Sequence, residues 1–487
     1  MSATAALIDW PLEAQDDTPL ALWSAGEIAA ATGGKASTAF AVNGVAFDSR
    51  EVMEGDLFLA LRGESADGHR FLGGAFGKGA AAALVEHPVL HPHVLVEDTT
   101  AALDALGRAA RARLASEARV IGVTGSAGKT SVKEALFAAL DRGSRGCAHR
   151  SVKSYNNHVG VPLSLARMPA RTQFGVFEMG MNHAGELSAL TRLVRPHVAI
   201  VTTIAPAHIG HFRGEEGIAD AKGEIFEGLE PGGVAIIPAD SRHYERLRTK
   251  AAQHAGTIVA FGRAAHADVR LLDVVPAPGG GSLVTAELGD RKLCYTVAQP
   301  GDHWVINSLA VMAAVHAAGG DLGAAGLALA EMAGLAGRGA RHTLAAPGGD
   351  GSGSAVLIDE SYNANPASMV ATLAELGKTP AARRIAVLGA MRELGADEDR
   401  YHADLAEPLL GAGIAHAVLV GPEMAALADA LGKSGAAALA APVQVDHVQT
   451  SAEAADVLAR IGIAGGDAIL VKGSNSVGLG ALVKALA

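Results

Sequence analysis

A short glycine-containing segment carries the residue types that bind a phosphate chain. It reads Thr-Gly-Ser-Ala-Gly-Lys-Thr from Thr124 to Thr130, after an apolar run at 120–123 and before apolar residues at helical spacing. This pattern predicts a strand, a turn and a helix N-terminus, where backbone N–H groups and the helix dipole face an anion. Lys129 can neutralise that anion, and the Thr130 hydroxyl can contact Mg²⁺. The residues expected to contact a nucleoside triphosphate are Gly125, Ser126, Ala127, Gly128, Lys129, Thr130 and Ser131.

This loop departs from the general P-loop pattern at one position. The pattern has a glycine five residues before Gly128, where this chain has Val123. We expect Gly125 to supply the flexibility instead. A chance glycine turn before a surface helix is the alternative, but Gly-Lys-Thr at a strand–helix junction favours the nucleotide site.

Composition bounds the class of protein. The chain has 487 residues, 49% of them hydrophobic, which is enough for about three domains. No apolar run approaches the ~20 residues of a membrane helix, and early acidic residues break any signal-peptide pattern. A net charge of −11 argues against nucleic acid as a partner, and two cysteines are too few for a disulfide framework. These features predict a cytoplasmic enzyme with no membrane span.

Alternating strand and helix patterns indicate an α/β fold with parallel sheets. We divide the chain into an acidic N-terminal extension (1–21), a small α/β N-terminal domain (22–117), a central P-loop ATPase domain with a parallel sheet (118–337) and a C-terminal Rossmann-like domain (338–487). Shorter, glycine-separated strands between 264 and 299 are expected to add antiparallel strands to the central domain. Ligands are expected at the carboxyl ends of the parallel strands.

Two polar residues fall at such strand ends. Glu178 ends the expected strand 174–178, and His208 follows the expected strand 198–204. If both strands neighbour the nucleotide strand, a carboxylate and an imidazole converge near the phosphates, where either can support a divalent ion. Taken alone each signal is weak, because a strand-end Glu is often solvated and a loop His is usually polar surface.

With these residues the chain resembles the ATP-dependent Mur ligases of peptidoglycan synthesis, over nearly everything from Leu22 to Leu486. The P-loop alone fits many ATPases. Two motifs, Lys-Gly-Glu-Ile-Phe at 222–226 and Ser-Tyr-Asn-Ala-Asn-Pro at 361–366, are specific to the branch of the family that adds a dipeptide. Further landmarks are Asp48-Ser49-Arg50, Asn156-Asn157, Glu178-Met179-Gly180, Gly337-Arg338-Gly339 and Lys472-Gly473-Ser474.

The resemblance implies ATP and Mg²⁺ in the central domain. Thr130, Glu178 and His208 match metal-coordinating positions, and Lys222 matches a lysine that CO₂ carbamylates, which makes it an anion that supports the metal. Lys129, Glu178, His208 and Lys222 are thereby the implied catalytic residues. Asn307 is implied near adenine, and Arg338 near the phosphates.

The resemblance also implies the two other substrates. Ser49 and Arg50 match a motif that holds the UDP end of a UDP-N-acetylmuramoyl-tripeptide, and an arginine suits phosphate or a uracil carbonyl. The C-terminal domain then presents D-Ala-D-Ala, whose amine attacks an acyl phosphate formed from ATP. The implied substrate-binding residues are Ser49, Arg50, Asn156, Asn157, Asp359, Tyr362, Asn363 and Asn365.

The asparagines of the last motif have a simpler alternative, in which they only cap and turn the backbone. Pro366 is expected to open the following helix at its first turn. We expect the protein to act as a monomer.

The chain departs from the family pattern at Ala390, where an Asp is usual, at Asn475, where an Arg is common, and at Trp304, which replaces an Asn. Two other functions remain open. One is a sister Mur ligase or a folylpolyglutamate-type ligase, which lacks the 361–366 motif. The other is a non-catalytic nucleotide-binding regulator, which the intact Lys129, Glu178 and Lys222 disfavour.

Overall fold

A computed structural model describes residues 21–63, 66–206, 212, 214–278, 280–346, 353–434 and 443–487. The chain divides into two compact units, one up to Ala109 and one from Ala110 onward. Sheets of five, nine and six strands and the helices around them confirm the α/β class. Among these described residues, no helix combines the length and the apolar character needed to cross a bilayer. The domain limits proposed from the sequence stay a prediction.

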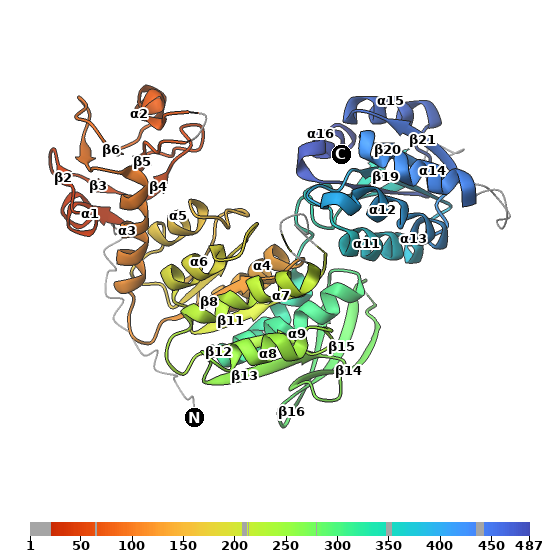
Figure 1. Cartoon of the computed structure of the whole chain (residues 1–487), viewed down its shortest axis with the longest axis horizontal. Coiled ribbons are helices and arrows are strands. Elements are labelled where there is room, and N and C mark those ends of the chain that lie inside the picture. Colours follow the sequence, from red (N-terminus) through yellow and green to blue (C-terminus); the bar gives the residue numbers. More distant parts are fainter. Residues whose placement is uncertain are drawn as a thin grey trace, which may run out of the picture. The chain divides into compact units, whose positions relative to one another are not determined.

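The first unit is built on a five-stranded sheet of order β2-β7-β6-β5-β4, in which only β2 runs antiparallel to its neighbour (Figure 1). Buried side chains such as Phe58 and Val85 pack beneath α2 and form its core. The strands are β1 (Trp23–Ser24), β2 (Lys35–Ala36), β3 (Ala41–Val42), β4 (Gly44–Ala46), β5 (Asp56–Leu59), β6 (Ala82–Val85) and β7 (His93–Leu95). The helices are α1 (Ala25–Thr32), α2 (Leu72–Gly77) and α3 (Thr99–Ala112), which contains the division point.

The second unit begins with a nine-stranded sheet of order β16-β15-β14-β13-β12-β11-β8-β10-β9. Its strands are β8 (Arg119–Thr124), β9 (Ala148–Arg150), β10 (Phe174–Glu178), β11 (Val198–Val201), β12 (Val234–Pro238), β13 (Thr257–Gly262), β14 (Val269–Pro276), β15 (Ser282–Leu288) and β16 (Arg291–Val297). The nucleotide strand β8 lies between β10 and β11, so the expected neighbours of that strand are confirmed.

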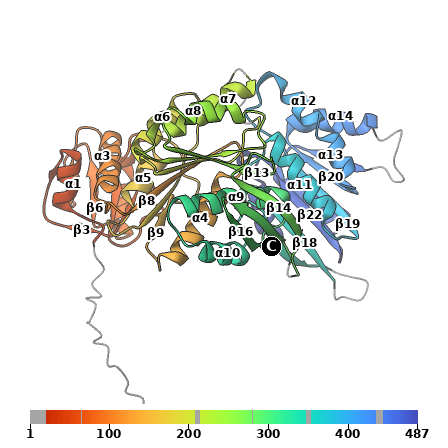
Figure 2. The ribbon, with the colours of Figure 1, turned by 90° about the horizontal axis from the view of Figure 1, so that it is seen from below.

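Helices cover both faces of this sheet, with α6, α7 and α8 on one side and α4, α9 and α10 on the other (Figure 2). The second side buries a continuous apolar core that includes Val123, Leu136 and Leu309. The helices are α4 (Lys129–Gly143), α5 (Gly160–Ala166), α6 (Glu186–Val194), α7 (Gly214–Gly223), α8 (Tyr244–Ala251), α9 (Asp302–Ala317) and α10 (Leu322–Glu331). This burial fixes the end of β8 and the start of α4, between which the phosphate loop runs.

Two expectations for this sheet can be compared with the structure. The antiparallel addition is confirmed, because β14, β15 and β16 pair antiparallel, with β14 joining the parallel strands beside β13. The expected strand 198–204 is too long, because β11 ends at Val201. Thr202 leaves the sheet and its hydroxyl donates to the Ala127 carbonyl at 2.5 Å, while the Thr203 carbonyl accepts from the Ser126 N–H at 2.8 Å. These residues support the phosphate loop instead of extending the ladder.

The second unit ends in a six-stranded sheet of order β17-β18-β22-β19-β20-β21, parallel except for β17. Its strands are β17 (Ala340–Ala345), β18 (Ser354–Glu360), β19 (Arg383–Gly389), β20 (His416–Val420), β21 (Gln444–Val448) and β22 (Asp467–Lys472). One face packs against α11 (Pro366–Lys378), α12 (Glu398–Ala403), α13 (Ala406–Gly411) and α14 (Ala425–Ser434). The other face packs against α15 (Ser451–Ile461) and α16 (Leu479–Leu486). The carboxyl ends of β18 and β22 lie side by side, with Glu360 paired to Lys472 in the register.

Candidate active site

The loop between β8 and α4 has the backbone of a phosphate cradle. Gly125 and Gly128 have φ angles of 151° and 82°, which side-chain-bearing residues rarely adopt, and α4 begins directly after Gly128. The Lys129 ammonium donates to the Gly125 carbonyl at 2.7 Å, so the cation lies across the loop. Gly125 therefore supplies the flexibility expected of it, with Val123 buried in the strand before.

Lys129 lies in an electrostatic setting suited to receiving an anion. Burial lowers the pKa of its ammonium, Glu178 opposes that shift, and the nearby Arg338 guanidinium adds to it. Two cations and a buried carboxylate thus meet beside the loop. A phosphate group there gains charge-assisted hydrogen bonds from both cations.

Glu178 is held in place by neighbours on two elements. Only 1% of the residue is exposed. The Thr130 hydroxyl donates to its Oε2 at 2.8 Å, and the Asn156 amide donates to its Oε1 at 2.8 Å. Its backbone N–H donates to the Ser151 hydroxyl at 3.0 Å. The sequence-predicted pair of Thr130 and Glu178 therefore meets, and its hydroxyl and carboxylate oxygens are hard donors of the kind Mg²⁺ prefers.

Lys133 belongs to the same cluster, and the sequence reasoning missed it. The side chain is fully buried on α4, one turn after Lys129. Its ammonium lies 3.0 Å from Glu134 Oε1 and 3.8 Å from Glu178 Oε2, and donates to the backbone carbonyl of Ser151 at 3.2 Å. The signal available was the four-residue spacing, which places Lys129 and Lys133 on one helix face.

Lys222 lies at the end of α7 and is 1% exposed. None of the described residues forms an ion pair with it. Burial lowers the pKa of its ammonium well below the usual value, and the positive charge of Lys129 adds to the effect. A neutral amine beside Lys129 is the form that reacts with CO₂. The predicted catalytic residue His208 lies outside the described residues.

A cavity of about 1040 Å³ opens beside the phosphate loop and is lined from both parts of the second unit. Loop residues 126–129 and Ser131 line one side. The lining also includes Asn156, Glu178, Asn307, Arg338, Glu360, Tyr362, Asn363, Asn365 and Lys472. Most of the predicted site residues of this unit therefore surround one space.

Asn307 packs against the phosphate loop, and its role near adenine stays a prediction. A Cβ atom placed on Gly128 would come within 2.8 Å of the Asn307 amide nitrogen, so this side chain packs directly against the phosphate loop. Trp304, one turn earlier on α9, is 3% exposed and belongs to the apolar core beneath the cavity. Trp304 also lines the cavity, so it packs in the core and faces the site.

Arg338 connects the two sides of the cavity. Its guanidinium donates to the Ser154 hydroxyl at 3.3 Å and lies 4.3 Å from the centre of the Tyr362 ring. The residue before it, Gly337, has a φ of 71° and donates its N–H to Asp359 Oδ2 at 2.7 Å. The glycine-flanked arginine thus sits on a backbone segment that the start of the C-terminal sheet fixes.

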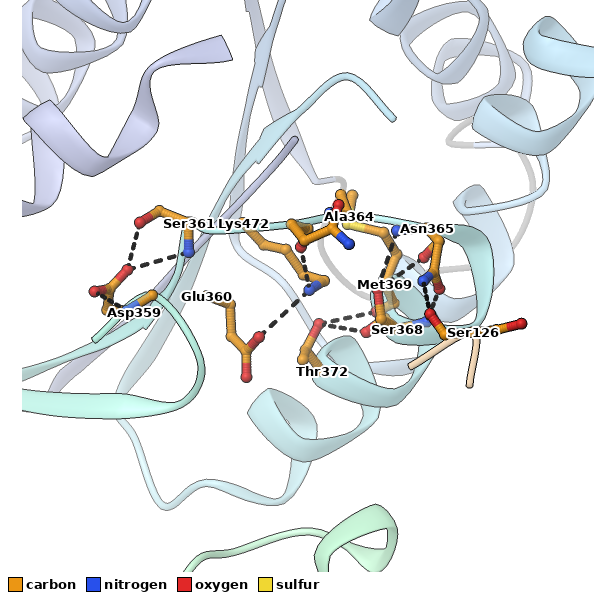
Figure 3. Close-up of polar contacts among 12 residues, drawn as sticks. Ser126, Asp359, Glu360, Ser361, Ala364, Asn365, Ser368, Met369, Thr372 and Lys472 are labelled. Carbon is orange, nitrogen blue, oxygen red and sulfur yellow. Dashed lines mark hydrogen bonds and ion pairs between the residues drawn. The ribbon is translucent and has the colours of Figure 1, made fainter. Parts of the chain in front are cut away.

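Asp359 does not line the cavity, which corrects the expectation from the sequence. The residue is 5% exposed, and its carboxylate accepts from the Gly337 N–H and from the Ser361 N–H and hydroxyl, the last two at 3.1 and 2.6 Å (Figure 3). Glu360 lines the cavity instead. Successive side chains of a strand point to opposite faces, so only one of these two acids can face the space.

The two asparagines of the 361–366 motif make different contacts. Asn365 caps α11, accepting from the Ser368 N–H at 2.9 Å, and Pro366 opens that helix as expected. The Asn365 amide also donates to the Ser126 carbonyl of the phosphate loop at 3.4 Å (Figure 3). Asn363 lines the cavity, and its carbonyl accepts from Lys472 at 3.0 Å. The capping alternative therefore holds for Asn365, which in addition contacts the loop.

Three further predicted residues are not among those that line this cavity. Asn157 accepts from the Gly160 N–H at 2.9 Å at the start of α5 and is absent from the lining. In the first unit, 86% of the Arg50 side chain is exposed, and its guanidinium pairs with Asp48 at 2.7 Å. Ser49 lies next to it in the chain. The substrate roles of Ser49, Arg50 and Asn157 stay predictions.

Three segments of the chain match known protein-family domains. Residues 41–139 match the Mur ligase family catalytic domain, residues 123–315 the Mur ligase middle domain, and residues 349–475 the Mur ligase glutamate ligase domain. These matches cover both described units.

Curated relatives and solved structures agree with these matches. The chain is 34% identical to UDP-N-acetylmuramoyl-tripeptide–D-alanyl-D-alanine ligase of Escherichia coli, over 80% of this chain and 84% of that protein. The Bacillus subtilis protein of the same name is 33% identical over 91% and 93%. A crystal structure of MurF from Acinetobacter baumannii matches 95% of this chain and 98% of its own, with a TM-score of 0.79 and 30% identity. MurF ligase from Thermotoga maritima, solved in complex with ADP, matches 91% and 96% with a TM-score of 0.71 and 25% identity.

The first prediction concerns the conformation of the phosphate loop. A Cβ atom at Gly125 would lie 1.9 Å from the Thr202 hydroxyl and 3.1 Å from the Thr203 nitrogen, in a backbone conformation that strains any side chain. Gly125→Ala should therefore weaken ADP binding, measured by calorimetry, at least about tenfold, which is ~1.4 kcal/mol. Gly143→Ala, at the far end of α4, meets nothing closer than 3.6 Å and serves as the control. Equal ADP affinities of the two variants would contradict this description of the loop.

Proposed function

The chain belongs to the Mur ligase family, and from this premise we propose that it joins D-Ala-D-Ala to UDP-N-acetylmuramoyl-tripeptide, with ATP converted to ADP and phosphate. The observation that carries the proposal is the shared cavity. It places the phosphate loop opposite the 361–366 motif, so that a phosphorylated acid and an incoming amine can meet in one space. The product is a precursor of peptidoglycan.

Lys129 and the backbone of the phosphate loop would hold the triphosphate. The Lys129 ammonium can exchange its contact with the Gly125 carbonyl for a phosphate oxygen, and Arg338 offers a second cation in the same cavity. Asn307 packs against Gly128 and would contact the nucleotide near its phosphates. These groups counter the negative charge that develops as the γ-phosphoryl group is transferred.

Thr130 and Glu178 fit a magnesium ion, because a hydroxyl and a buried carboxylate meet there beside the loop. Bound Mg²⁺ offsets charge on the phosphates. We propose that Lys222 acts after carbamylation as a further anion on this side of the site and that His208 also contributes. The support for Lys222 is its burial without an acidic partner among the described residues.

The reaction follows from the weakness of a carboxylate as an electrophile. The carboxylate of the muramoyl tripeptide attacks the γ-phosphorus, and ADP leaves with the electron pair of the broken P–O bond. The terminal ammonium of the dipeptide loses a proton to solvent, and the neutral amine attacks the acyl carbon of the resulting acyl phosphate. Inorganic phosphate leaves with the electron pair of the broken C–O bond, and the nitrogen loses its second proton as the amide forms. Water competes at the acyl carbon, so the chain must cover this carbon during the reaction. Arg338 and Asn365, which contact residues of the nucleotide-binding part, are suited to that covering.

We assign the UDP end of the acceptor to the first unit, where Ser49 and the exposed Arg50 carry the motif for it. Asp48 holds the Arg50 guanidinium in a fork, so the arginine is oriented before the substrate arrives. ATP and UDP-linked precursors are cytoplasmic compounds, and we place the reaction in the cytoplasm.

A sister ligase that adds a single amino acid is the nearest alternative. Two features favour the dipeptide. The 361–366 motif lines or contacts the cavity with neutral amides, which suit a peptide bond, and the relatives named above carry the dipeptide in their names. A non-catalytic regulator is disfavoured because Lys129, Glu178 and Lys222 are all present in one region, where Glu178 and Lys222 are buried and Lys129 is half-buried.

The proposed function predicts which amine is consumed. With ATP and UDP-N-acetylmuramoyl-tripeptide present, phosphate release should depend on D-Ala-D-Ala and should stay near background with free D-Glu, lysine or diaminopimelate. The measurement is phosphate release over this panel of amines, with mass spectrometry of the product. Ligation of a single amino acid and not of the dipeptide would refute the branch assignment and leave the ligase chemistry standing.

Lys222 gives a second test. In ¹³C-bicarbonate, the wild-type protein should show a ¹³C NMR carbamate signal that Lys222→Ala removes, and that variant should be nearly inactive and partly rescued by small carboxylates. Lys250→Ala is the control, because Lys250 already has an acidic partner in Glu227, at 3.5 Å. A carbamate signal that survives in Lys222→Ala, or its absence from the wild type, would contradict the assignment.

A further inference from the structure

Glu360 and Lys472 form a largely buried ion pair at the cavity, and the sequence assigned neither residue a role. They end the neighbouring strands β18 and β22 and face each other in the register (Figure 3). The distance from the Lys472 ammonium to Glu360 Oε2 is 3.4 Å. Both side chains line the cavity, on the side that carries the 361–366 motif.

Lys472 is fixed in position. Only 2% of its side chain is exposed, and its ammonium also donates to the Asn363 carbonyl at 3.0 Å. Burial lowers the pKa of this ammonium, while Glu360 opposes the shift. The lysine therefore joins the end of β22 to the loop that contains Asn363 and holds Glu360 at its side.

The Glu360 carboxylate can accept more hydrogen bonds than it does. Its side chain is 17% exposed, and Lys472 is the one hydrogen-bond donor to it among the residues that the structure describes. A carboxylate accepts several hydrogen bonds, and a mostly buried one is costly unless they are made. His303 is near, but burial lowers the pKa of its imidazole, so it adds little positive charge. The free Oε1 is thus available to a donor that enters the cavity.

The chemistry of the three substrates indicates which of them donates a hydrogen bond to Glu360. ATP is an anion, and the muramoyl tripeptide enters the reaction through a carboxylate, so both are repelled by Glu360. The dipeptide brings a cation at its reacting end, its terminal ammonium, and it is expected on the C-terminal side of the cavity. Glu178 and Thr130 already supply the oxygen ligands for a metal on the other side.

We propose that Glu360 binds the terminal ammonium group of the incoming dipeptide and that Lys472 positions the Glu360 carboxylate for this contact. The inference rests on the proposed function. It assigns to Glu360 the role of selecting an amine as the second substrate. A hydroxyl in place of the ammonium would lose the charge-assisted hydrogen bond, so the site discriminates against hydroxy acids.

The test is Glu360→Gln, which keeps the size of the side chain and removes its charge. The KM for D-Ala-D-Ala should rise at least tenfold, while the KM for ATP stays within twofold of the wild-type value. The inhibition constant of D-lactoyl-D-alanine, which carries a hydroxyl in place of the ammonium, should also stay within twofold. A merely structural role would weaken both dipeptide ligands together, which would overturn the proposal.

Glu423→Gln is the matched control. The Glu423 side chain is also 17% exposed in the C-terminal sheet region, where it pairs with Arg392, and it does not line the cavity. This variant should keep all three constants. If the wild type ligates the dipeptide and Glu360→Gln keeps its dipeptide KM within twofold, the ammonium site is refuted and the proposed function stands. If the wild type does not ligate the dipeptide, the proposed function fails and the inference fails with it.

Discussion

The hydrogen bond from Thr130 to Glu178 ties the first turn of α4 to the end of β10, and the geometry of the site depends on it. The contact requires β10 to lie beside β8 and requires the loop between β8 and α4 to turn tightly at Gly125 and Gly128. The apolar core under α4 fixes the helix against the sheet. Lys133 then places a buried cation next to the Glu178 carboxylate. The backbone and the charged side chains of the phosphate loop are therefore in place before a nucleotide binds.

The C-terminal sheet is coupled to this loop by a few polar contacts within the second unit. Asn365 reaches the Ser126 carbonyl, and Arg338 reaches Ser154, whose hydroxyl also lies 3.3 Å from that of Thr130. Such contacts are few and polar, and each is worth only about 1 kcal/mol. Such contacts can form when substrates bind and break when products leave. A large apolar interface would resist that opening.

The sequence predicted those parts of the site whose position follows from local rules. The phosphate loop and Glu178 lie at strand ends, and the order of strands brought them together as expected. The sequence did not predict the direction in which a side chain points. Asp359 and Glu360 are adjacent acids, and the pattern did not say which one faces the cavity. The contact of Asn307 with Gly128 depends on how α4 and α9 pack, which no local motif contains.

The transfer of oxygen from the acceptor carboxylate to phosphate tests the proposed chemistry most directly. The muramoyl tripeptide is prepared with ¹⁸O in the carboxylate that is ligated, and the phosphate released in the presence of ATP and D-Ala-D-Ala is analysed by mass spectrometry. Formation of an acyl phosphate predicts one ¹⁸O atom in each phosphate released by ligation, because the attacking oxygen stays bound to phosphorus when the amine displaces it. Phosphate that carries no ¹⁸O while the amide product forms would contradict activation of the carboxylate at this site.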